Sequence, residues 1–324
     1  MLKIEPALRP NICLLGGTGF VGHHVAALLS EHRYAVRIPT RRSERHRELR
    51  VLPGVDVVHA NVHDPEDLHR VVQDCAAVIN LVGILNEERS GDFRRVHVEL
   101  PGKVVDACAG AGVRRLLHMS ALNAGSPAGR SRYLQTKGEG EALVHAARDL
   151  HVTSFRPSVI FGPDDHFFNR FGRLLKWSPF VMPLPCADAR FAPVFVGDVS
   201  QAMMTALQDD HTVGQRYDLC GPRVYSLKAL VRYTAEVLNL RRRVLGLGDG
   251  LSRLQARIGG LLPGKPFSHD NYLSMQTDAV CGGRFPEVFA IAPAAVEAIV
   301  PLYLGQLNQR QRLAEFRIQA RHSY

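Results

Sequence analysis

The chain has little of several features that define whole classes of protein. No window approaches the roughly 18 uncharged apolar residues that a membrane span requires. Residues 1–9 hold no apolar core of signal-peptide length, so we expect a cytoplasmic protein. Aromatic residues make up only 7% of the chain, and it has no helix-turn-helix, zinc or RNA-binding signature. The sequence therefore predicts no nucleic-acid partner.

Cysteine is sparse and scattered, and no two cysteines form a Cys-x-x-Cys pair. This spacing indicates neither a zinc site nor a disulfide framework, so we expect reduced and mostly buried thiols. The 15 histidines, including His23 and His24, lack metal-ligand spacing with acidic or thiol partners. The sequence thus predicts no metal site. The six cysteines are Cys13, Cys75, Cys108, Cys186, Cys220 and Cys281.

What is present is the composition of a globular chain. Hydrophobic residues are 46% and charged residues 22% of 324 positions, which allows one large or two modest domains. Much of the formal net charge of +9 lies in residues 41–47 and 310–321. A positive balance favours an acidic partner such as a phosphate ligand or an anionic lipid. The last basic segment predicts either a solvated terminal helix or a helix peripheral to an anionic inner membrane face.

A glycine-rich stretch near the start organises the chain. Residues 10–15 are an apolar run typical of a buried parallel strand, and a helix with apolar periodicity follows the glycines. Gly17 allows the tight turn, Gly19 lets a pyrophosphate approach the backbone, and Gly22 lets the helix lie close to the strand. The amides of the helix N-terminus then face the anion. The predicted dinucleotide contacts are Gly16, Gly17, Thr18, Gly19, Phe20, Val21 and Gly22.

The end of the second strand bears on the choice of cofactor. The strand at residues 34–40 is followed by Arg41 and Arg42. An acidic residue at this place would accept hydrogen bonds from a ribose 2′-hydroxyl, whereas arginine suits a 2′-phosphate. No Asp or Glu occurs after this strand until Glu44, which favours NADP(H) over NAD(H).

Two later strands also end at candidate cofactor contacts. The strand at residues 55–60 leads to Asn61 and Val62, which either meet the adenine or form an ordinary turn and a core position. The apolar strand at residues 76–83 ends in a small residue, which suits close backbone approach beneath a ribose or nicotinamide. Its candidate contacts are Leu81, Val82 and Gly83.

A Tyr-x-x-x-Lys pair follows this pattern. A long helix carries His97, and the next strand ends at Ser120. Across a loop, Tyr133 and Lys137 stand four residues apart on a predicted helix, so they project from the same face. Such a pair is commonplace on amphipathic helices, but the serine and the glycine turn make the combination specific. Strand and helix alternate throughout, which predicts a parallel sheet with a ligand at its carboxyl edge.

In type and order, these motifs resemble the extended and atypical branch of the short-chain dehydrogenase/reductase superfamily, which includes NAD-dependent epimerases and dehydratases. Residues 155–163 and 194–199 also follow the pattern of that family. With His97 and residues 118–122, the chain looks most like the subgroup containing the NDUFA-type accessory subunit of respiratory complex I and its bacterial relatives. The similarity covers most of residues 10–240.

The resemblance implies an α/β fold: a Rossmann domain with a doubly wound parallel sheet, and a smaller C-terminal α/β part that binds a small-molecule substrate. We expect the Rossmann domain at residues 1–165, with a return at about residues 190–225, and the substrate part at residues 166–324. Within that part, an apolar stripe at residues 167–177, which includes Trp177, predicts a core or cleft wall.

The resemblance also implies roles for the site residues. Tyr133 is the general acid or base, Lys137 lowers its pKa and binds the nicotinamide ribose, and Ser120 holds the substrate oxygen. A phenol with a pKa near ~10 exchanges protons poorly at neutral pH until an ammonium favours its ionised form. Pro157 belongs to the same expected cofactor site, which takes NADP(H), with NAD(H) as the alternative.

The leading hypothesis is an oxidoreductase that transfers a hydride between NADP(H) and a small carbonyl or alcohol. His97 stands where many family enzymes have an asparagine that supports a proton-relay water, and this departure keeps other functions open. One is a non-catalytic NAD(P)H-binding accessory or assembly protein of a respiratory or quinone system, associated through the basic C-terminus. Another is a nucleotide-sugar epimerase or dehydratase, although no pair of basic residues for a diphosphate is recognisable. The substrate and oligomeric state are not readable from the sequence.

Overall fold

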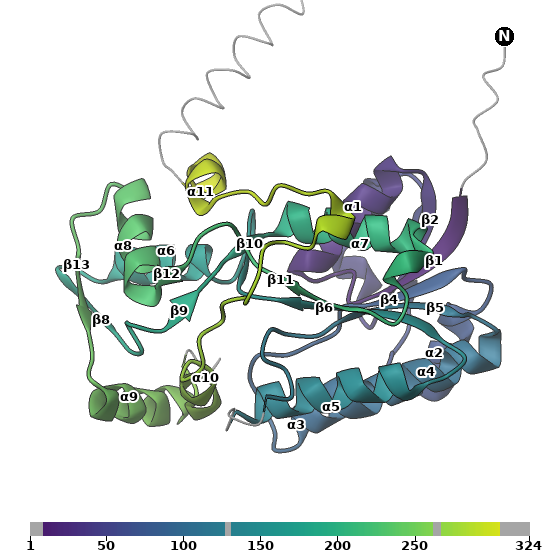
Figure 1. The fold of residues 1–324 in the computed structure, drawn as a ribbon, viewed down its shortest axis with the longest axis horizontal. Coiled ribbons are helices and arrows are strands. Elements are labelled where there is room, and N and C mark those ends of the chain that lie inside the picture. Colours follow the sequence, from purple (N-terminus) through teal and green to yellow (C-terminus); the bar gives the residue numbers. More distant parts are fainter. Residues whose placement is uncertain (1–8, 127–130, 262–266, 305–324) are drawn as a thin grey trace, which may run out of the picture. The chain divides into compact units, whose positions relative to one another are not determined.

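The structure is a computed structural model that describes residues 9–126, 131–261 and 267–304. The chain forms two compact units (Figure 1). Among the described residues, the first unit comprises those up to Pro157 together with two later returns of the chain, Gly197–Leu219 and Pro286–Ile291, and the second comprises the others. The sequence predicts a boundary at residue 165 and a return at about residues 190–225. Segments far apart in the sequence thus build each unit.

A seven-stranded parallel sheet forms the centre of the first unit. Its strands are β1 (Arg9–Leu15), β2 (Tyr34–Thr40), β3 (Val55–His59), β4 (Ala77–Asn80), β5 (Arg115–Met119), β6 (His151–Pro157) and β11 (Arg216–Leu219). Their order is β11-β6-β5-β4-β1-β2-β3. The chain order reverses between β1 and β4, and open sheets of this kind bind ligands at the carboxyl ends of the strands beside such a point. This architecture confirms the predicted Rossmann fold.

Helices cover both faces of this sheet. They are α1 (Phe20–Glu31), α2 (Pro65–Val72), α3 (Asp92–Arg94), α4 (Leu100–Ala111), α5 (Arg132–Ala146) and α7 (Val196–Gln208). Figure 1 shows α2, α4 and α5 on one face, with α1 and α7 on the other. Buried apolar residues of α2, α4 and α5, such as Leu68, Val104 and Val144, pack in a hydrophobic core of the unit. Short 3-10 turns are η1 (Ser43–Arg45), η2 (Arg47–Val51), η4 (Asp210–Thr212) and η5 (Glu287–Phe289).

A π-helical turn, η3 (Arg95–Glu99), joins α3 to α4. Pro101 lacks the N–H that would bond the carbonyl of His97 in a regular α-helix, which favours a wider turn at this place. The His97 carbonyl lies against α5 instead, since a Cβ added at Gly140 would come within 1.8 Å of the His97 oxygen. The π turn and this glycine therefore hold His97 close to α5.

The second unit contains three two-stranded sheets and five helices among its described residues. Its strands are β7 (Ile160–Phe161), β8 (Val181–Leu184), β9 (Arg190–Phe191), β10 (Val194–Phe195), β12 (Tyr225–Ser226) and β13 (Arg243–Gly246). Its helices are α6 (Phe168–Trp177), α8 (Leu227–Val237), α9 (Asp249–Leu261), α10 (His269–Ser274) and α11 (Val296–Leu304). Phe168, Leu175, Leu230 and Val244 are part of its core. Among the described helices of both units, none combines the length and apolar character that crossing a membrane requires.

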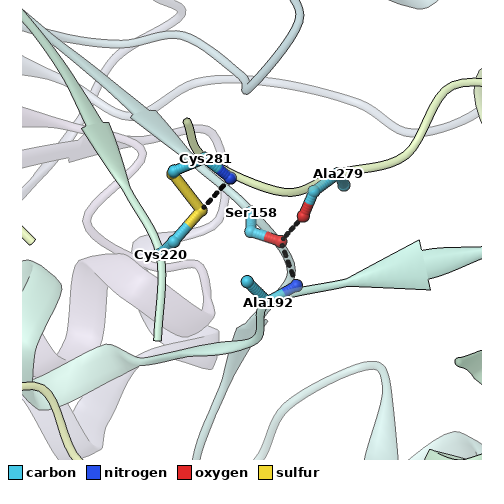
Figure 2. Close-up of a disulfide and its surroundings, with 5 residues drawn as sticks. All are labelled: Ser158, Ala192, Cys220, Ala279 and Cys281. Atoms are coloured by element: carbon cyan, nitrogen blue, oxygen red, sulfur yellow. Dashed lines mark hydrogen bonds between the residues drawn. A yellow bond between two sulfur atoms is a disulfide. The ribbon is translucent and has the colours of Figure 1, made fainter. Parts of the chain in front are cut away.

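A disulfide joins Cys220 to Cys281 in the second unit (Figure 2). Beside it, the Ser158 hydroxyl donates to the Ala279 carbonyl at 2.7 Å and accepts the Ala192 N–H at 3.3 Å, which fixes the segment before Cys281. The expectation of reduced thiols is wrong for this pair. The two cysteines are 61 residues apart, and only the folded chain brings them together. The free cysteines of the described chain are Cys13, Cys75, Cys108 and Cys186.

Candidate active site

The turn between β1 and α1 has the close approaches that the glycine pattern predicts. Gly16 adopts the left-handed conformation at φ +80°, and its carbonyl accepts the Gly19 N–H at 3.0 Å. A Cβ at Gly22 would lie 2.3 Å from the Gly16 oxygen and 2.6 Å from the Gly17 Cα, so a larger residue does not fit. No side chain caps α1 at Gly19, and no acidic residue stands in the first turn. The first amides of α1 are therefore suited to an anion.

Basic side chains gather beyond the ends of β2 and β3. Arg41 and Arg42 are exposed directly after β2. The Lys103 ammonium donates to the His63 carbonyl at 2.6 Å. Burial is the main reason why the pKa of His63 is lowered, and three nearby cations add to the effect: Arg95, Lys103 and Arg41. This concentration of positive charge suits a phosphate group.

Asn61 and Val62 lie in the turn that follows β3. The Asn61 N–H donates to the Asp67 carboxylate at 2.8 Å, and the Asn61 side-chain oxygen accepts the His63 N–H at 3.3 Å. Val62 packs partly against the apolar core of the unit. Both residues thus have structural roles, and their contact with an adenine stays a prediction.

The segment after β4 lies next to both the glycine turn and α5. A Cβ at Gly16 would lie 3.0 Å from the Leu81 carbonyl carbon, and a Cβ at Gly83 would lie 3.1 Å from Lys137 Nζ. The Val82 N–H donates to the Asn80 side chain at 3.1 Å, which fixes the segment between them. Leu81, Val82 and Gly83 therefore link the phosphate-binding turn with the lysine.

Lys137 is buried at the carboxyl edge of the sheet, with 5% of its surface exposed. Its Nζ donates to the Met119 carbonyl at the end of β5 at 3.0 Å. Burial lowers the pKa of Lys137 to about 8, against the opposing effect of the Glu141 carboxylate. Because this value lies above neutrality, Lys137 remains an ammonium at pH 7.

Tyr133 stands one turn before Lys137 on α5 and is half-buried. Its ring packs edge-on against His97 and Phe93, with ring centroids 5.4 and 5.9 Å apart. Phe93 in turn stacks on His97 at 5.4 Å. This aromatic cluster holds the Tyr133 ring beside the π turn.

His97 is held as a neutral imidazole with both nitrogens engaged. Its Nε2 accepts the Ile84 N–H at 3.2 Å, so Nδ1 carries the proton and donates to Thr136 Oγ1 at 3.0 Å. Burial, followed by the charge of Lys137, lowers the pKa of His97 to about 3. His97 therefore positions the loop after β4 and the first turns of α5, and it has no ring nitrogen left to bind a relay water.

Ser120 takes part in a buried ionic network. Its Oγ donates to Glu141 at 2.7 Å. The Glu141 carboxylate also accepts Arg156 Nε at 2.9 Å and Arg216 Nε at 3.2 Å. The network connects the end of β5 to α5, β6 and β11, and no sequence pattern points to Glu141 or Arg216 as members of it.

The sequence-predicted site residues of the first unit all lie at or beyond the carboxyl ends of its strands or on α5. Pro157 is the last residue of β6, and its carbonyl accepts the Leu122 N–H at 3.1 Å. The structure thus brings the predicted residues to one edge of the sheet. It does not by itself test their roles, which stay predictions.

A cluster of metal-ligand side chains has no signal in the sequence. Nε2 of His23, in the first turn of α1, lies 3.2 Å from a Glu48 carboxylate oxygen, and His46 Nδ1 lies 3.4 Å from the same oxygen. The three groups are close enough to hold a metal ion together. Hydrogen bonds between the imidazoles and the Glu48 carboxylate account for the same geometry, and the absence of a metal site stays a prediction. Only the fold of the loop after β2 brings these residues together.

The fold, the glycine turn and the Tyr-Lys pair define a dinucleotide-binding protein related to the extended short-chain dehydrogenases. A sequence model described as the NAD dependent epimerase/dehydratase family matches residues 12–220, and the chain belongs to this family. Its relatives include both complex I subunits and reductases.

Three comparisons describe these relationships. NADH dehydrogenase (ubiquinone) 1 alpha subcomplex subunit 9, mitochondrial, of Mus musculus is 33% identical over 228 residues, which are 68% of this chain and 59% of the relative. The chain thus spans about three fifths of that relative's length. Ceramide reductase of Caulobacter vibrioides is 29% identical over 243 residues, 74% of each chain. The structure of MoeE5 in complex with UDP-glucuronic acid and NAD shares the fold, with a TM-score of 0.62 and 20% identity over 74% of this chain and 85% of that chain.

Proposed function

We propose that the protein is an oxidoreductase that transfers a hydride between NADP(H) and a small carbonyl or alcohol, with Tyr133 as acid or base. The observation that supports this most is the place of Lys137. Its ammonium lies beside Gly83 at the carboxyl edge of the sheet, one helical turn from Tyr133. The segment at residues 81–83 also lies against the glycine turn, which leaves helix amides accessible.

The residues of the first unit fit such a cofactor. The first amides of α1 would bind the pyrophosphate, since Gly19 and Gly22 keep side chains away from the turn. The backbone at Gly83 and the Lys137 ammonium would meet the nicotinamide ribose. When bound, the cofactor supplies or accepts the hydride.

The chain itself would hold and move a proton. A charged Lys137 favours the phenolate form of Tyr133, which lowers the cost of proton transfer at neutral pH. During reduction the Tyr133 hydroxyl would donate its proton to the substrate oxygen, and during oxidation the phenolate would accept one. The contacts with Phe93 and His97 orient the phenol ring for this transfer.

The preference for NADP(H) within this NAD-dependent family is supported by charge. Arg41 follows β2, where the adenosine ribose of a Rossmann cofactor lies, and no acidic residue precedes it there. Two further cations, Arg95 and Lys103, lie near His63 and strengthen the positive potential at this edge.

Single-turnover kinetics tests the proposed reaction. Protein and NADPH would be mixed with a panel of carbonyl compounds, including long-chain lipid ketones because one relative is named a ceramide reductase. Loss of the near-ultraviolet absorbance of reduced nicotinamide reports hydride transfer. We expect Tyr133→Phe to slow this step by about 100-fold or more while NADPH affinity stays the same. Tyr34→Phe is the control, because the Tyr34 hydroxyl binds Gln208 away from the site. Unchanged turnover in Tyr133→Phe would overturn the proposal.

A second candidate function is that of a cofactor-holding accessory subunit of a respiratory system. It is supported by the relative named as a complex I subunit and by His97, whose nitrogens are both engaged. Cofactor retention without turnover on any member of the panel would favour it. Its predicted attachment through the basic C-terminus, at residues 310–321, lies outside the described residues. The cytoplasmic location also stays a prediction.

A further inference from the structure

The second unit exposes large apolar side chains beside the pair of strands β8 and β13. Trp177 is 90% exposed, Phe180 78%, Leu245 53% and Val181 41%. The sequence prediction that Trp177 belongs to a core or cleft wall is therefore wrong. α6 ends at this residue, so the apolar stripe of the helix is buried at Phe168 and Leu175 but reaches solvent at its last turn.

Backbone pairing places two of these side chains, Val181 and Leu245, on the same face of the strand pair. Val181 pairs with Arg243, and Pro183 pairs with Leu245. The Arg243 N–H also donates to the Phe180 carbonyl at 3.0 Å. Met182, Leu184 and Val244 are buried, whereas Val181, Pro183, Arg243 and Leu245 face solvent. We call the resulting surface the strand-pair face; it consists of Trp177, Phe180, Val181, Pro183, Arg243 and Leu245.

The two segments that form the strand-pair face are basic, although acidic residues stand directly outside them at Asp165, Asp188, Glu236 and Asp249. Residues 166–187 and 237–248 contain six Lys or Arg residues and no Asp or Glu: Arg170, Arg173, Lys176, Arg241, Arg242 and Arg243. Arg242 Nε donates to the Leu175 carbonyl at 3.3 Å, which keeps this basic run next to the end of α6. Within the part of the chain that the structure describes, Lys176, Arg241 and Arg243 form no ion pair with a carboxylate.

We propose that the strand-pair face docks on the surface of an anionic phospholipid bilayer. Exposed tryptophan and phenylalanine favour the boundary between headgroups and acyl chains, and unpaired Lys and Arg beside them favour negative headgroups. Each basic residue near such a surface strengthens binding about fivefold. A second copy of the chain fits less well, because a symmetric contact would oppose the same positive charges.

The chain contains a single tryptophan, and it lies on this face. Its fluorescence in the full-length protein therefore reports on the strand-pair face alone. With vesicles of phosphatidylcholine in which about a third of the lipid is phosphatidylglycerol, we expect a blue shift and quenching by brominated acyl chains. Pure phosphatidylcholine should give neither effect, and added salt should weaken both. A Trp177 spectrum that anionic vesicles do not change would overturn the proposal.

Substitutions that retain Trp177 locate the binding. The double variant Phe180→Ser and Leu245→Ser should partition onto anionic vesicles about tenfold or more weakly in co-sedimentation. Val51→Ser should bind as the wild type does, because Val51 is as exposed as Phe180, at 78%, but belongs to the first unit. Equal binding of the double variant would place the lipid contact elsewhere in the chain and refute the proposal. If the wild type forms a dimer and binds no lipid, and only the double variant loses the dimer, the face belongs to a contact with a second copy. This outcome would also refute the proposal.

Discussion

The Ser120 hydroxyl donates its hydrogen bond to Glu141, a carboxylate with only 2% of its side chain exposed. A hydroxyl has a single proton, so Ser120 does not donate to a substrate oxygen while this bond is in place. Arg156 and Arg216 supply the positive charge that allows Glu141 to be buried. In this structure Ser120 therefore helps to fix α5, and with it Lys137, against the end of β5.

Replacing Ser120 separates this positioning role from the predicted substrate contact. In Ser120→Ala, Glu141 loses one donor in a buried place, and we expect the free energy of unfolding to fall by about 1–2 kcal/mol. Turnover should fall only a few-fold. Urea denaturation and single-turnover kinetics on the same preparation measure the two effects. A loss of about 100-fold or more in turnover with unchanged stability would instead support the substrate role.

Local patterns are enough to predict the fold, the glycine turn and the helical spacing of the Tyr-Lys pair. The apolar run before Gly16, the three spaced glycines and the periodic helix lie within a short stretch, and the backbone geometry of that stretch depends mainly on its own residues. Likewise, the helical repeat alone predicts that Tyr133 and Lys137 project from the same face of a helix. Both features could be read without knowing which distant segments meet.

Contacts between distant segments could not be predicted in this way. Nothing in the sequence pairs Glu141 with Arg216, which the sheet brings together through β11. The same holds for His23 with Glu48 and for Cys220 with Cys281. Helical spacing does not show where a helix leaves the core, and for this reason the predicted place of Trp177 in a core or cleft wall is wrong.

Arg41 tests the cofactor preference. If its guanidinium binds a 2′-phosphate, Arg41→Ala should weaken NADPH binding by about 10- to 100-fold and leave NADH binding unchanged, because only NADPH carries that group. Calorimetric titration of both cofactors measures this. Arg47→Ala is a matched control, since Arg47 is exposed on the same loop and lies 3.9 Å from Glu44. Equal affinities for the two cofactors in wild type and Arg41→Ala would refute the assignment.

Gly22 tests the close approach of α1 to the glycine turn. In Gly22→Ala the added Cβ would meet backbone atoms at 2.3 and 2.6 Å, which cannot move aside as a side chain can. We expect a loss of about 3 kcal/mol in the free energy of unfolding and weaker dinucleotide binding. In the control Gly102→Ala, the nearest atom is a Leu143 methyl at 3.6 Å, so the substitution should be neutral or stabilise α4 by about 0.5–1 kcal/mol. Thermal and urea denaturation distinguish the two, and equal effects would contradict the geometry.

Lys137 should give stability a specific pH dependence. Burial holds its pKa at about 8 in the folded protein, below the ordinary 10.5. Between these values the unfolded chain binds more protons than the folded chain, so the free energy of unfolding rises with pH. Lys137→Met lacks this group. The free energy of unfolding of the wild type, minus that of the variant, should therefore increase from pH 7 to about pH 10, by at most about 3 kcal/mol. A difference that stays constant across this range, measured by urea denaturation, would mean that Lys137 titrates as it does in water.

The disulfide predicts a definite number of reactive thiols. Protein purified without reductant and then denatured should give four thiols per chain with a colorimetric reagent, and six after reduction, because Cys220 and Cys281 are joined and four cysteines are free.

The double variant Cys220→Ser and Cys281→Ser should lower the free energy of unfolding relative to the oxidised wild type by up to about 4 kcal/mol, since the bond closes a long loop in the unfolded chain. Cys186→Ser, which replaces a free and half-buried thiol, controls for loss of a cysteine alone. Since disulfides persist mainly in oxidising compartments, six thiols in protein taken directly from cells would show that the bond is open where the protein works, in agreement with the predicted cytoplasmic location.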